Sequence, residues 1–593
     1  MVGPEQKILT LECEECTKLS SAALSKECDE CINKRQFDIL RLKNKLFIKE
    51  YDKKRRLLSV TPFFMDVRLA PKPAGATVIK EYLLPTGAKV EILRDKEGIN
   101  IHYHLKIPET NITFQEIIDV TKEIEKFEET NETKNDLIKK WFLGYGILEH
   151  MLQDKRLLEV NINPPGYKTA MRLVHGEFDE CVSNIYPSDD FLNLLATRLK
   201  ILTGRPLNKA QPQLDGEIQV KNTKARVAAI IDPFSIFGPG YSIRIHREKP
   251  WTLPLFIDNK AVSPLFAGFM SFIITHGRSF LTAGPRGSGK TSLLGSLLLE
   301  ILPKYRIITI EDTQELPINS YKELGYDLLP LKVRSALLKE GMEMPFDTGL
   351  RTSLRLGDSC LIIGEIRSKE AKVLYEAMRV GAMSNVVAGT IHADNPYGVF
   401  DRVVNDLDVP RGSFKVTDLI IIVNQIKDPT GLTRVRRVFS VTEVLKNWEH
   451  EPEFQDLLVY NPQSDMLEPT DFLMKGKSVV LNQILGRTRG YKNYNDMLND
   501  IMLRSWSKEL LVKIGTKEEY EAEYIAKGNI IFTKLFNQIL PLQSKKNIDK
   551  FKVQYEKELR EYLLETRKLK KHQTKATSKE EEKEDAKPKK VKA

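Results

Sequence analysis

The 593-residue sequence has no uninterrupted run of 18 apolar residues, so we expect no transmembrane helix. Its first residues do not form a secretory signal, which makes a cytoplasmic protein the default expectation. Cysteine is also scarce, with six residues, and a cytosolic compartment argues against disulfides. Hydrophobic residues make up 41% and charged residues 29%, proportions that suit a soluble globular protein of several domains.

Most of the few cysteines lie together near the start of the chain. Cys13, Cys16, Cys28 and Cys31 have the spacing C-x2-C-x11-C-x2-C. Four thiolates in two such pairs suit a closed structural Zn²⁺ site, although the spacer is shorter than usual. A redox-active or disulfide pair, or unrelated thiols, are the alternatives. Cys181 and Cys360 lie alone in apolar surroundings and are expected in the core.

The formal net charge of +10 gives only weak support for an anionic partner. Part of that charge lies in residues 568–593, a lysine-rich segment with few aliphatic residues, which we predict to be disordered. Contact of this segment with anionic lipid or nucleic acid is the alternative to a solvated tail.

One short segment carries the strongest chemical signal. It reads Gly284-Pro285-Arg286-Gly287-Ser288-Gly289-Lys290-Thr291 and fits G-x-x-x-x-G-K-[ST], the phosphate-binding loop of nucleoside triphosphatases. An apolar segment suited to a buried strand precedes it, and a stretch of helical period follows it. Backbone N–H groups of such a loop surround phosphate, Lys290 reaches the β- and γ-phosphates, and Thr291 offers its hydroxyl to Mg²⁺.

Polar residues follow the apolar strands predicted beyond this loop. These strands cover about 306–310, 358–367, 384–392 and 418–423, and they indicate a mostly parallel sheet with helices on its faces. Glu311, Glu365 and His392 fall at strand ends, where such sheets bind ligands. We expect Glu365 to orient the attacking water and support Mg²⁺, Glu311 to help hold the metal shell, and His392 to sense the γ-phosphate.

The part of the chain before this domain is expected to be α+β. Residues 34–56 are predicted to be helical, residues 75–108 to form a strand meander, and residues 113–127 and 134–154 to be helices. A helix is predicted over residues 187–202. Arg226 and Arg244 lie in apolar strands, either to stabilise phosphate charge or as part of a basic surface.

The order of four motifs resembles the type II/type IV secretion ATPase superfamily, and residues 377–392 and 395–404 resemble its archaeal members. The motifs are a Walker A loop at 284–291, an "Asp box" at 309–313, a Walker B element at 362–367 and a "His box" at 389–393. The resemblance implies a RecA-like P-loop domain that hydrolyses ATP after a smaller α+β N-terminal domain. It makes Glu365 the catalytic glutamate. It places Arg226, Arg244, Arg351 and Arg355 near the nucleotide.

The resemblance further implies a homo-hexamer that powers pilus or archaellum assembly, or secretion. Such a motor acts at the cytoplasmic face of the membrane, with an integral-membrane platform protein as partner, and needs no nucleic acid. A nucleic-acid translocase or helicase, and a non-hydrolysing scaffold, are the alternatives. The predicted domains are 1–35 (zinc-binding), 36–134 (accessory), 135–252 (α+β), 253–448 (RecA-like), 449–567 (helical extension) and 568–593 (disordered).

Overall fold

The structure of the protein is a computed structural model that describes residues 67–111 and 140–585 with short gaps, and three strands before them. The gaps are residues 142–143, 167, 222, 248, 334–345, 354, 358, 368–369, 381–385, 428, 432–433 and 540–543. The four cysteines of the predicted zinc site and the helix predicted at 113–127 lie outside the described residues. The chain divides into two compact units, residues 1–248 and 249–593, and each is treated by itself.

The first unit contains a three-stranded antiparallel sheet where the sequence predicted a helix at 34–56. Its strands are β1 (Phe37–Leu42), β2 (Lys45–Tyr51) and β3 (Leu57–Pro62). The helix prediction was wrong because the same aliphatic and aromatic residues also suit a strand, and here each strand has a partner to pair with.

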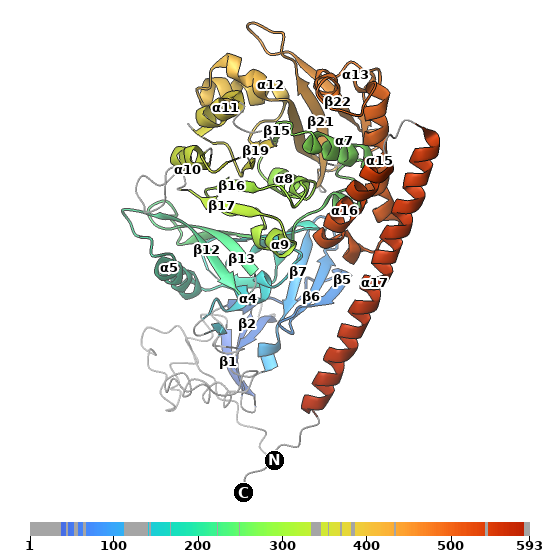
Figure 1. Ribbon diagram of the computed structural model, residues 1–593. Coiled ribbons are helices and arrows are strands. Elements are labelled where there is room, and N and C mark those ends of the chain that lie inside the picture. Colours follow the sequence, from blue (N-terminus) through green and yellow to red (C-terminus); the bar gives the residue numbers. More distant parts are fainter. Residues whose placement is uncertain are drawn as a thin grey trace, which may run out of the picture. The chain divides into compact units, whose positions relative to one another are not determined.

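A nine-stranded mixed sheet forms the centre of the first unit (Figure 1). In spatial order its strands are β12 (Gln213–Val220), β13 (Thr223–Ile230), β14 (Gly240–Ile245), β8 (Leu157–Ile162), β9 (Arg172–His175), β10 (Asp179–Ser183), β7 (Ile101–Lys106), β6 (Lys89–Arg94) and β5 (Thr77–Leu83). The predicted meander at 75–108 is therefore confirmed. Strand β7 pairs in parallel with β10, so this sheet crosses the boundary predicted at residue 134.

Two helices pack on this sheet. Helix α5 (Asp189–Thr203) confirms the helix predicted at 187–202; the Ser188 side chain caps its start by accepting from the Phe191 N–H, and Gly204 ends it. The helix predicted at 134–154 is present chiefly as the shorter α4 (Ile147–Leu152).

The second unit is built on another nine-stranded sheet. In spatial order its strands are β17 (Leu328–Lys332), β16 (Ile307–Glu311), β18 (Cys360–Ile363), β19 (Val387–Ile391), β15 (Phe280–Ala283), β20 (Leu419–Lys427), β21 (Arg434–Val444), β22 (Phe454–Asn461) and β23 (Met466–Pro469). The first six strands in this order are parallel to one another. The last three, β21, β22 and β23, continue the sheet in antiparallel fashion. The parallel sheet predicted from the apolar runs is confirmed.

Apolar side chains leave this sheet on both faces, as expected for buried parallel strands. Phe280 and Ile307 pack into one apolar cluster with α7 (Pro264–Thr275) and α8 (Lys290–Leu298). Leu281 and Ile308 pack into a second cluster with residues of α10 (Phe346–Ser353), α11 (Glu370–Val380) and α12 (Pro396–Asp401). Two helical layers therefore hold the parallel strands between them.

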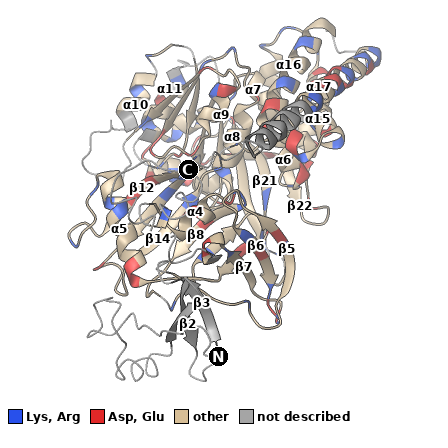
Figure 2. Cartoon of the chain, turned by 90° about the horizontal axis from the view of Figure 1, so that it is seen from below, with Lys and Arg blue, Asp and Glu red and all other residues tan. Residues whose placement is uncertain are grey.

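The end of the chain is less purely helical than predicted. Strands β22 and β23 occupy the start of the expected helical extension, because their residues extend the edge of the sheet. Helices α15 (Tyr494–Ile514), α16 (Ala522–Ile539) and α17 (Lys545–Asp585) follow. Helix replaces the disorder predicted for 568–585, where Lys, Glu and Ala are good helix formers. In the described part of the chain no helix is long and apolar enough to span a membrane, and Lys and Arg are interspersed with Asp and Glu (Figure 2).

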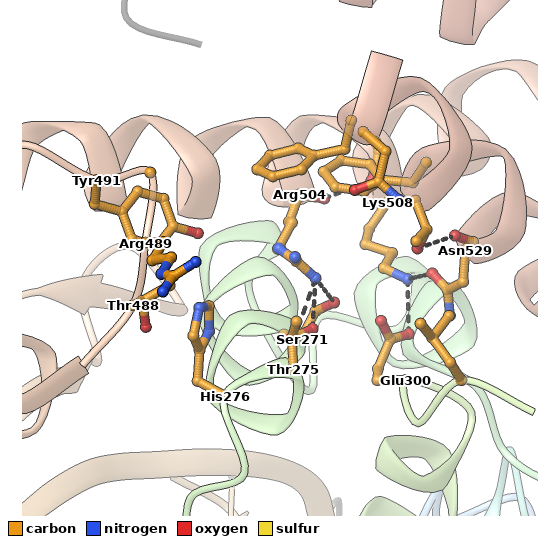
Figure 3. A pocket seen from close by; sticks show the side chains of 17 residues that line it. Ser271, Thr275, His276, Glu300, Thr488, Arg489, Tyr491, Arg504, Lys508 and Asn529 are labelled. Atoms are coloured by element: carbon orange, nitrogen blue, oxygen red, sulfur yellow. Dashed lines mark hydrogen bonds and ion pairs between the residues drawn. The ribbon is translucent and has the colours of Figure 1, made fainter. Parts of the chain in front are cut away.

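A buried ion pair ties the C-terminal helices to the helix that follows the phosphate loop. Lys508 of α15 donates to Glu300, just beyond α8, at 2.6 Å, and to Asn529 of α16 at 2.5 Å. Asn529 in turn donates to the Leu299 carbonyl at 2.8 Å. The pair lies at one end of a cavity of about 230 Å³ whose other end is lined by His276 and Arg489 (Figure 3).

We expect Glu300→Ala to lower the free energy of unfolding by about 3–5 kcal/mol, because it leaves a buried ammonium without its partner. The side chains of Glu300 and Lys508 are 1% and 7% exposed, and burial already lowers the pKa of Lys508. Thermal unfolding measures the loss. Asp471→Ala, which removes an exposed ion pair with Lys475, is the control and should change little. Equal melting temperatures for Glu300→Ala and wild type would contradict this account.

Candidate active site

The phosphate-binding loop follows the central strand β15, which lies between the parallel strands β19 and β20. Helix α8 begins at Lys290, directly after the loop. A side chain at Gly284 would collide with the Val423 carbonyl oxygen, so only glycine fits where the loop leaves the strand. The structure thus places the predicted loop between a buried strand and the start of a helix, as anion binding requires.

The loop carries donors that fit a bound phosphate. The Ser288 hydroxyl is buried and has no hydrogen-bond partner among the described residues. The Lys290 side chain is 7% exposed, and its Nζ donates to the Pro285 carbonyl of the loop at 2.9 Å. An ammonium and a hydroxyl held inside the loop are suitable donors for phosphate oxygens.

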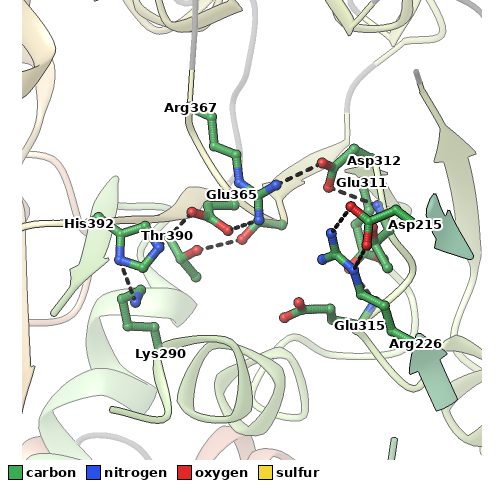
Figure 4. A network of polar contacts seen from close by, with 12 residues as sticks. Asp215, Arg226, Lys290, Glu311, Asp312, Glu315, Glu365, Arg367, Thr390 and His392 are labelled. Carbon is green, nitrogen blue, oxygen red and sulfur yellow. Dashed lines mark hydrogen bonds and ion pairs between the residues drawn. The ribbon is translucent and has the colours of Figure 1, made fainter. Parts of the chain in front are cut away.

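A chain of polar contacts joins Lys290 to the strand ends (Figure 4). Lys290 Nζ lies 3.3 Å from Nδ1 of His392, which follows β19. His392 Nε2 lies 2.9 Å from Oε1 of Glu365, just beyond β18. The other oxygen of Glu365 accepts from Arg367, and Arg367 also donates to Asp312 at 3.0 Å. Three of the predicted residues, Lys290, His392 and Glu365, are therefore in one network.

The direction of these hydrogen bonds follows from the protonation states. Burial, with the charge of Lys290, lowers the pKa of His392, so the ring is neutral at neutral pH. Its Nδ1 then accepts from the Lys290 ammonium, and its Nε2–H donates to Glu365. Burial opposes ionisation of Glu365, but Arg367, His392 and Lys290 outweigh it and lower the pKa of this carboxyl. Glu365 is thus an ionised carboxylate held by a donor on each oxygen.

Glu311 lies apart from that network in its contacts. The residue is 4% exposed, and one oxygen of its carboxyl group accepts from the backbone N–H groups of Glu315 and Leu316 at 3.0 and 3.1 Å. Its Cγ would lie 2.8 Å from a Cβ at position 364, which explains the glycine before Glu365. Glu311 therefore anchors the loop after β16, and its predicted part in the metal shell stays a prediction.

Burial raises the pKa of Glu311 to about 8, against the two backbone hydrogen bonds, which lower it. The folded protein then keeps a proton that the unfolded chain releases above about pH 4.5. The corresponding stability is complete below that pH and is lost as the pH rises through 8. It amounts to a few kcal/mol at most, at about 1.4 kcal/mol per pKa unit.

We therefore expect Glu311→Gln to gain in melting temperature relative to wild type as the pH rises from 5.5 to 8.5. Thermal unfolding of both proteins across this range measures the difference, in which the titrations of other groups largely cancel. A constant difference between the two melting temperatures would show that Glu311 does not take up a proton on folding.

The predicted arginines have different settings. Arg226 and Arg244 belong to the first unit, where they are cross-strand neighbours on β13 and β14. Arg226 pairs with Asp215 at 3.4 Å (Figure 4), and Arg244 lies 4.0 Å from Glu159. Arg351 is exposed in the last turn of α10. Their predicted contact with nucleotide stays a prediction.

Arg367 and Asp312 were missed as functional residues in the sequence. Asp312 directly follows Glu311, and Arg367 lies two residues after Glu365. This closeness to the motif carboxylates was the signal available in the sequence. Their pairing needs β16 and β18 to be neighbours, a fact of topology and not of local pattern.

The loop and the network offer oxygen ligands that suit Mg²⁺, namely the hydroxyl of Thr291 in the first turn of α8 and the ionised carboxylate of Glu365. Within the described residues, no group of three or more His, Cys, Asp or Glu side chains could hold a metal ion by itself. The cysteines predicted to bind zinc lie outside that part, so the zinc site stays a prediction.

The sequence matches the family "Type II/IV secretion system protein" over residues 161–429. An uncharacterized protein of Methanocaldococcus jannaschii is 27% identical over 397 residues, which are 66% of this chain and 68% of that protein. A putative conjugal transfer protein of Mycobacterium tuberculosis is 30% identical over 257 residues, 43% of this chain and 70% of that protein.

Solved structures that match include the pilus retraction motor PilT with bound ADP, at 16% identity and a TM-score of 0.36. The alignment covers 63% of this chain and 95% of that one. The Legionella pneumophila ATPase DotB matches at 15% identity and a TM-score of 0.36, over 68% of this chain and 94% of that one.

Proposed function

The chain belongs to the type II/IV secretion ATPase superfamily, and from this premise we propose that it is a hexameric motor driven by ATP hydrolysis. The motor powers assembly of a type IV pilus-like filament or archaellum, or protein secretion. It works at the inner face of the cell membrane, in peripheral contact with it, on an integral-membrane platform protein.

The observation that carries this proposal is the network from Lys290 through His392 and Glu365 to Arg367. It joins the phosphate loop to an ionised carboxylate at the carboxyl ends of parallel strands, where such sheets bind ligands. A phosphate loop alone supports nucleotide binding. A charged carboxylate one histidine away from the loop's lysine adds the group that hydrolysis needs.

In the proposed reaction Lys290 and the backbone N–H groups of the loop bind the phosphates of ATP. To reach them, Lys290 exchanges its contacts with Pro285 and His392 for phosphate oxygens. Mg²⁺ held by the Thr291 hydroxyl and the Glu365 carboxylate would neutralise charge on the phosphates. His392 Nδ1 then loses its donor, so the histidine reports that the loop is occupied.

Glu365 orients water for attack on the γ-phosphorus. As the new P–O bond forms and the bond to ADP breaks, the proton of the water passes to the carboxylate and then to phosphate. Arg367 and His392 keep Glu365 ionised and fix its orientation. Loss of Arg367 would raise the pKa of Glu365, because burial already opposes its ionisation, and a protonated carboxyl is unable to accept that proton.

The net charge of +10 is the one observation that favours a nucleic-acid translocase. Lys and Arg are interspersed with Asp and Glu in the described part, so charge gives this alternative little support (Figure 2). ATP turnover of the purified protein with single-stranded DNA, with RNA and with anionic liposomes separates the two functions. The motor should respond to liposomes and ignore nucleic acid. Strong stimulation by DNA or RNA alone would replace it with the translocase.

A further inference from the structure

Two side chains from outside the phosphate loop form hydrogen bonds to it at Gly287. The Gly287 carbonyl accepts from Gln425 Nε2 and from Arg436 Nε, each at 2.9 Å. Gln425 lies near the end of β20 and Arg436 near the start of β21. The two residues are direct partners in the antiparallel pairing of these strands. Both side chains therefore leave the same face of the hairpin and meet at one acceptor.

The hairpin also packs directly on the loop at other points. The register of β20 against β21 shifts between Ile422 and Val423, and the Val423 carbonyl occupies the space that a side chain at Gly284 would need. Arg436 Cδ would lie 3.6 Å from a Cβ at Gly289. Such irregularities bend a strand and re-aim its side chains, and they are frequent beside active sites. Here the shift lies just before Gln425 on β20 and just after Arg436 on β21.

The Gly287 carbonyl that accepts these hydrogen bonds belongs to the same peptide group as the N–H of Ser288. In the structure this N–H donates to the Pro285 carbonyl at 3.3 Å, the same oxygen that receives Lys290. Donors on a carbonyl oxygen polarise the N–H on the other side of the peptide bond, and a charged donor does so more strongly. Arg436 and Gln425 therefore strengthen Ser288 N–H as a donor and keep it turned inward.

We propose that Arg436 and Gln425 are positioning residues of the nucleotide site, which set its affinity for the phosphates of nucleoside di- and triphosphates. They act through Gly287 on the loop's backbone donors. This inference rests on the proposed function, because it assumes that the loop binds nucleotide.

Equilibrium binding of ADP and of pyrophosphate, each with Mg²⁺, to Arg436→Gln tests the proposal on the full chain. Both dissociation constants should rise about tenfold, because one charge-assisted hydrogen bond is lost. The binding of pyrophosphate, which has neither base nor ribose, should weaken by the same factor as the binding of ADP. Arg436→Lys, which keeps a charged donor, should recover most of the affinity. Steady-state kinetics should show a higher KM for ATP with a smaller change in kcat.

Lys427→Gln makes the same charge change two residues beyond Gln425 on β20 and is the matched control. If Arg436→Gln unfolds, Gln425→Ala decides, with an expected rise of about threefold. Wild-type protein that binds ADP, beside an Arg436→Gln variant within twofold of it, would overturn this inference and leave the proposed function intact. Wild-type protein that binds no nucleotide would overturn both.

Discussion

Replacement of Glu365 by glutamine is expected to lower ATP turnover about 10³-fold while the dissociation constant of ADP changes less than threefold. Glutamine has nearly the same shape, so the loop and Lys290 remain able to bind phosphate. It is unable to take a proton from water, and it removes one of the two carboxylate partners that the structure gives Arg367. The loss should therefore appear in kcat and not in nucleotide affinity.

Phosphate release under saturating Mg²⁺ and ATP measures this effect, with ADP binding to the same preparations. Glu376→Gln is a suitable control because it makes the same chemical change at a residue that is exposed on α11. Turnover that persists in Glu365→Gln would assign the catalytic carboxylate to another residue.

Lys290→Met is expected to weaken ADP and ATP binding about 100-fold. The methionine keeps most of the buried stem but removes the ammonium that points into the loop. It also removes the donor to His392 Nδ1. The stabilisation of wild-type protein by ADP, which grows with ligand concentration, should then largely disappear.

The rise in melting temperature with increasing ADP measures the second prediction. Lys304→Met removes an exposed lysine a short distance beyond α8 and should leave the rise unchanged. An equal ADP-induced rise in Lys290→Met and wild type would mean that the loop is not where ADP binds.

Local patterns were enough to predict the centre of the site. The loop from Gly284 to Thr291 has a fixed spacing, and the strands around it are short apolar runs. Because parallel strands end at the same edge of a sheet, residues that follow them, such as Glu365 and His392, could be expected near each other. The structure confirms that they are neighbours, with His392 Nε2 2.9 Å from Glu365 Oε1.

Local patterns could not predict the features that depend on pairing between strands far apart in the sequence. The Arg367–Asp312 contact needs β16 and β18 side by side, and the pairing of β7 with β10 joins segments about 80 residues apart in sequence. The helix predicted for residues 34–56 was wrong because apolar residues there fit either period, and the pairing of β1 with β2 is what favours strand. The hydrogen bonds that Glu311 accepts from the Glu315 and Leu316 N–H groups were not predicted either, and its part in a metal shell stays a prediction.

The most direct test of the central claim is phosphate release from Mg²⁺-ATP by the purified wild-type protein, measured beside its affinity for ATP. The network of Lys290, His392 and Glu365 predicts steady, Mg²⁺-dependent release over many turnovers. Protein that binds ATP tightly but releases no phosphate would contradict the account, because it would be a nucleotide-binding scaffold and not a motor.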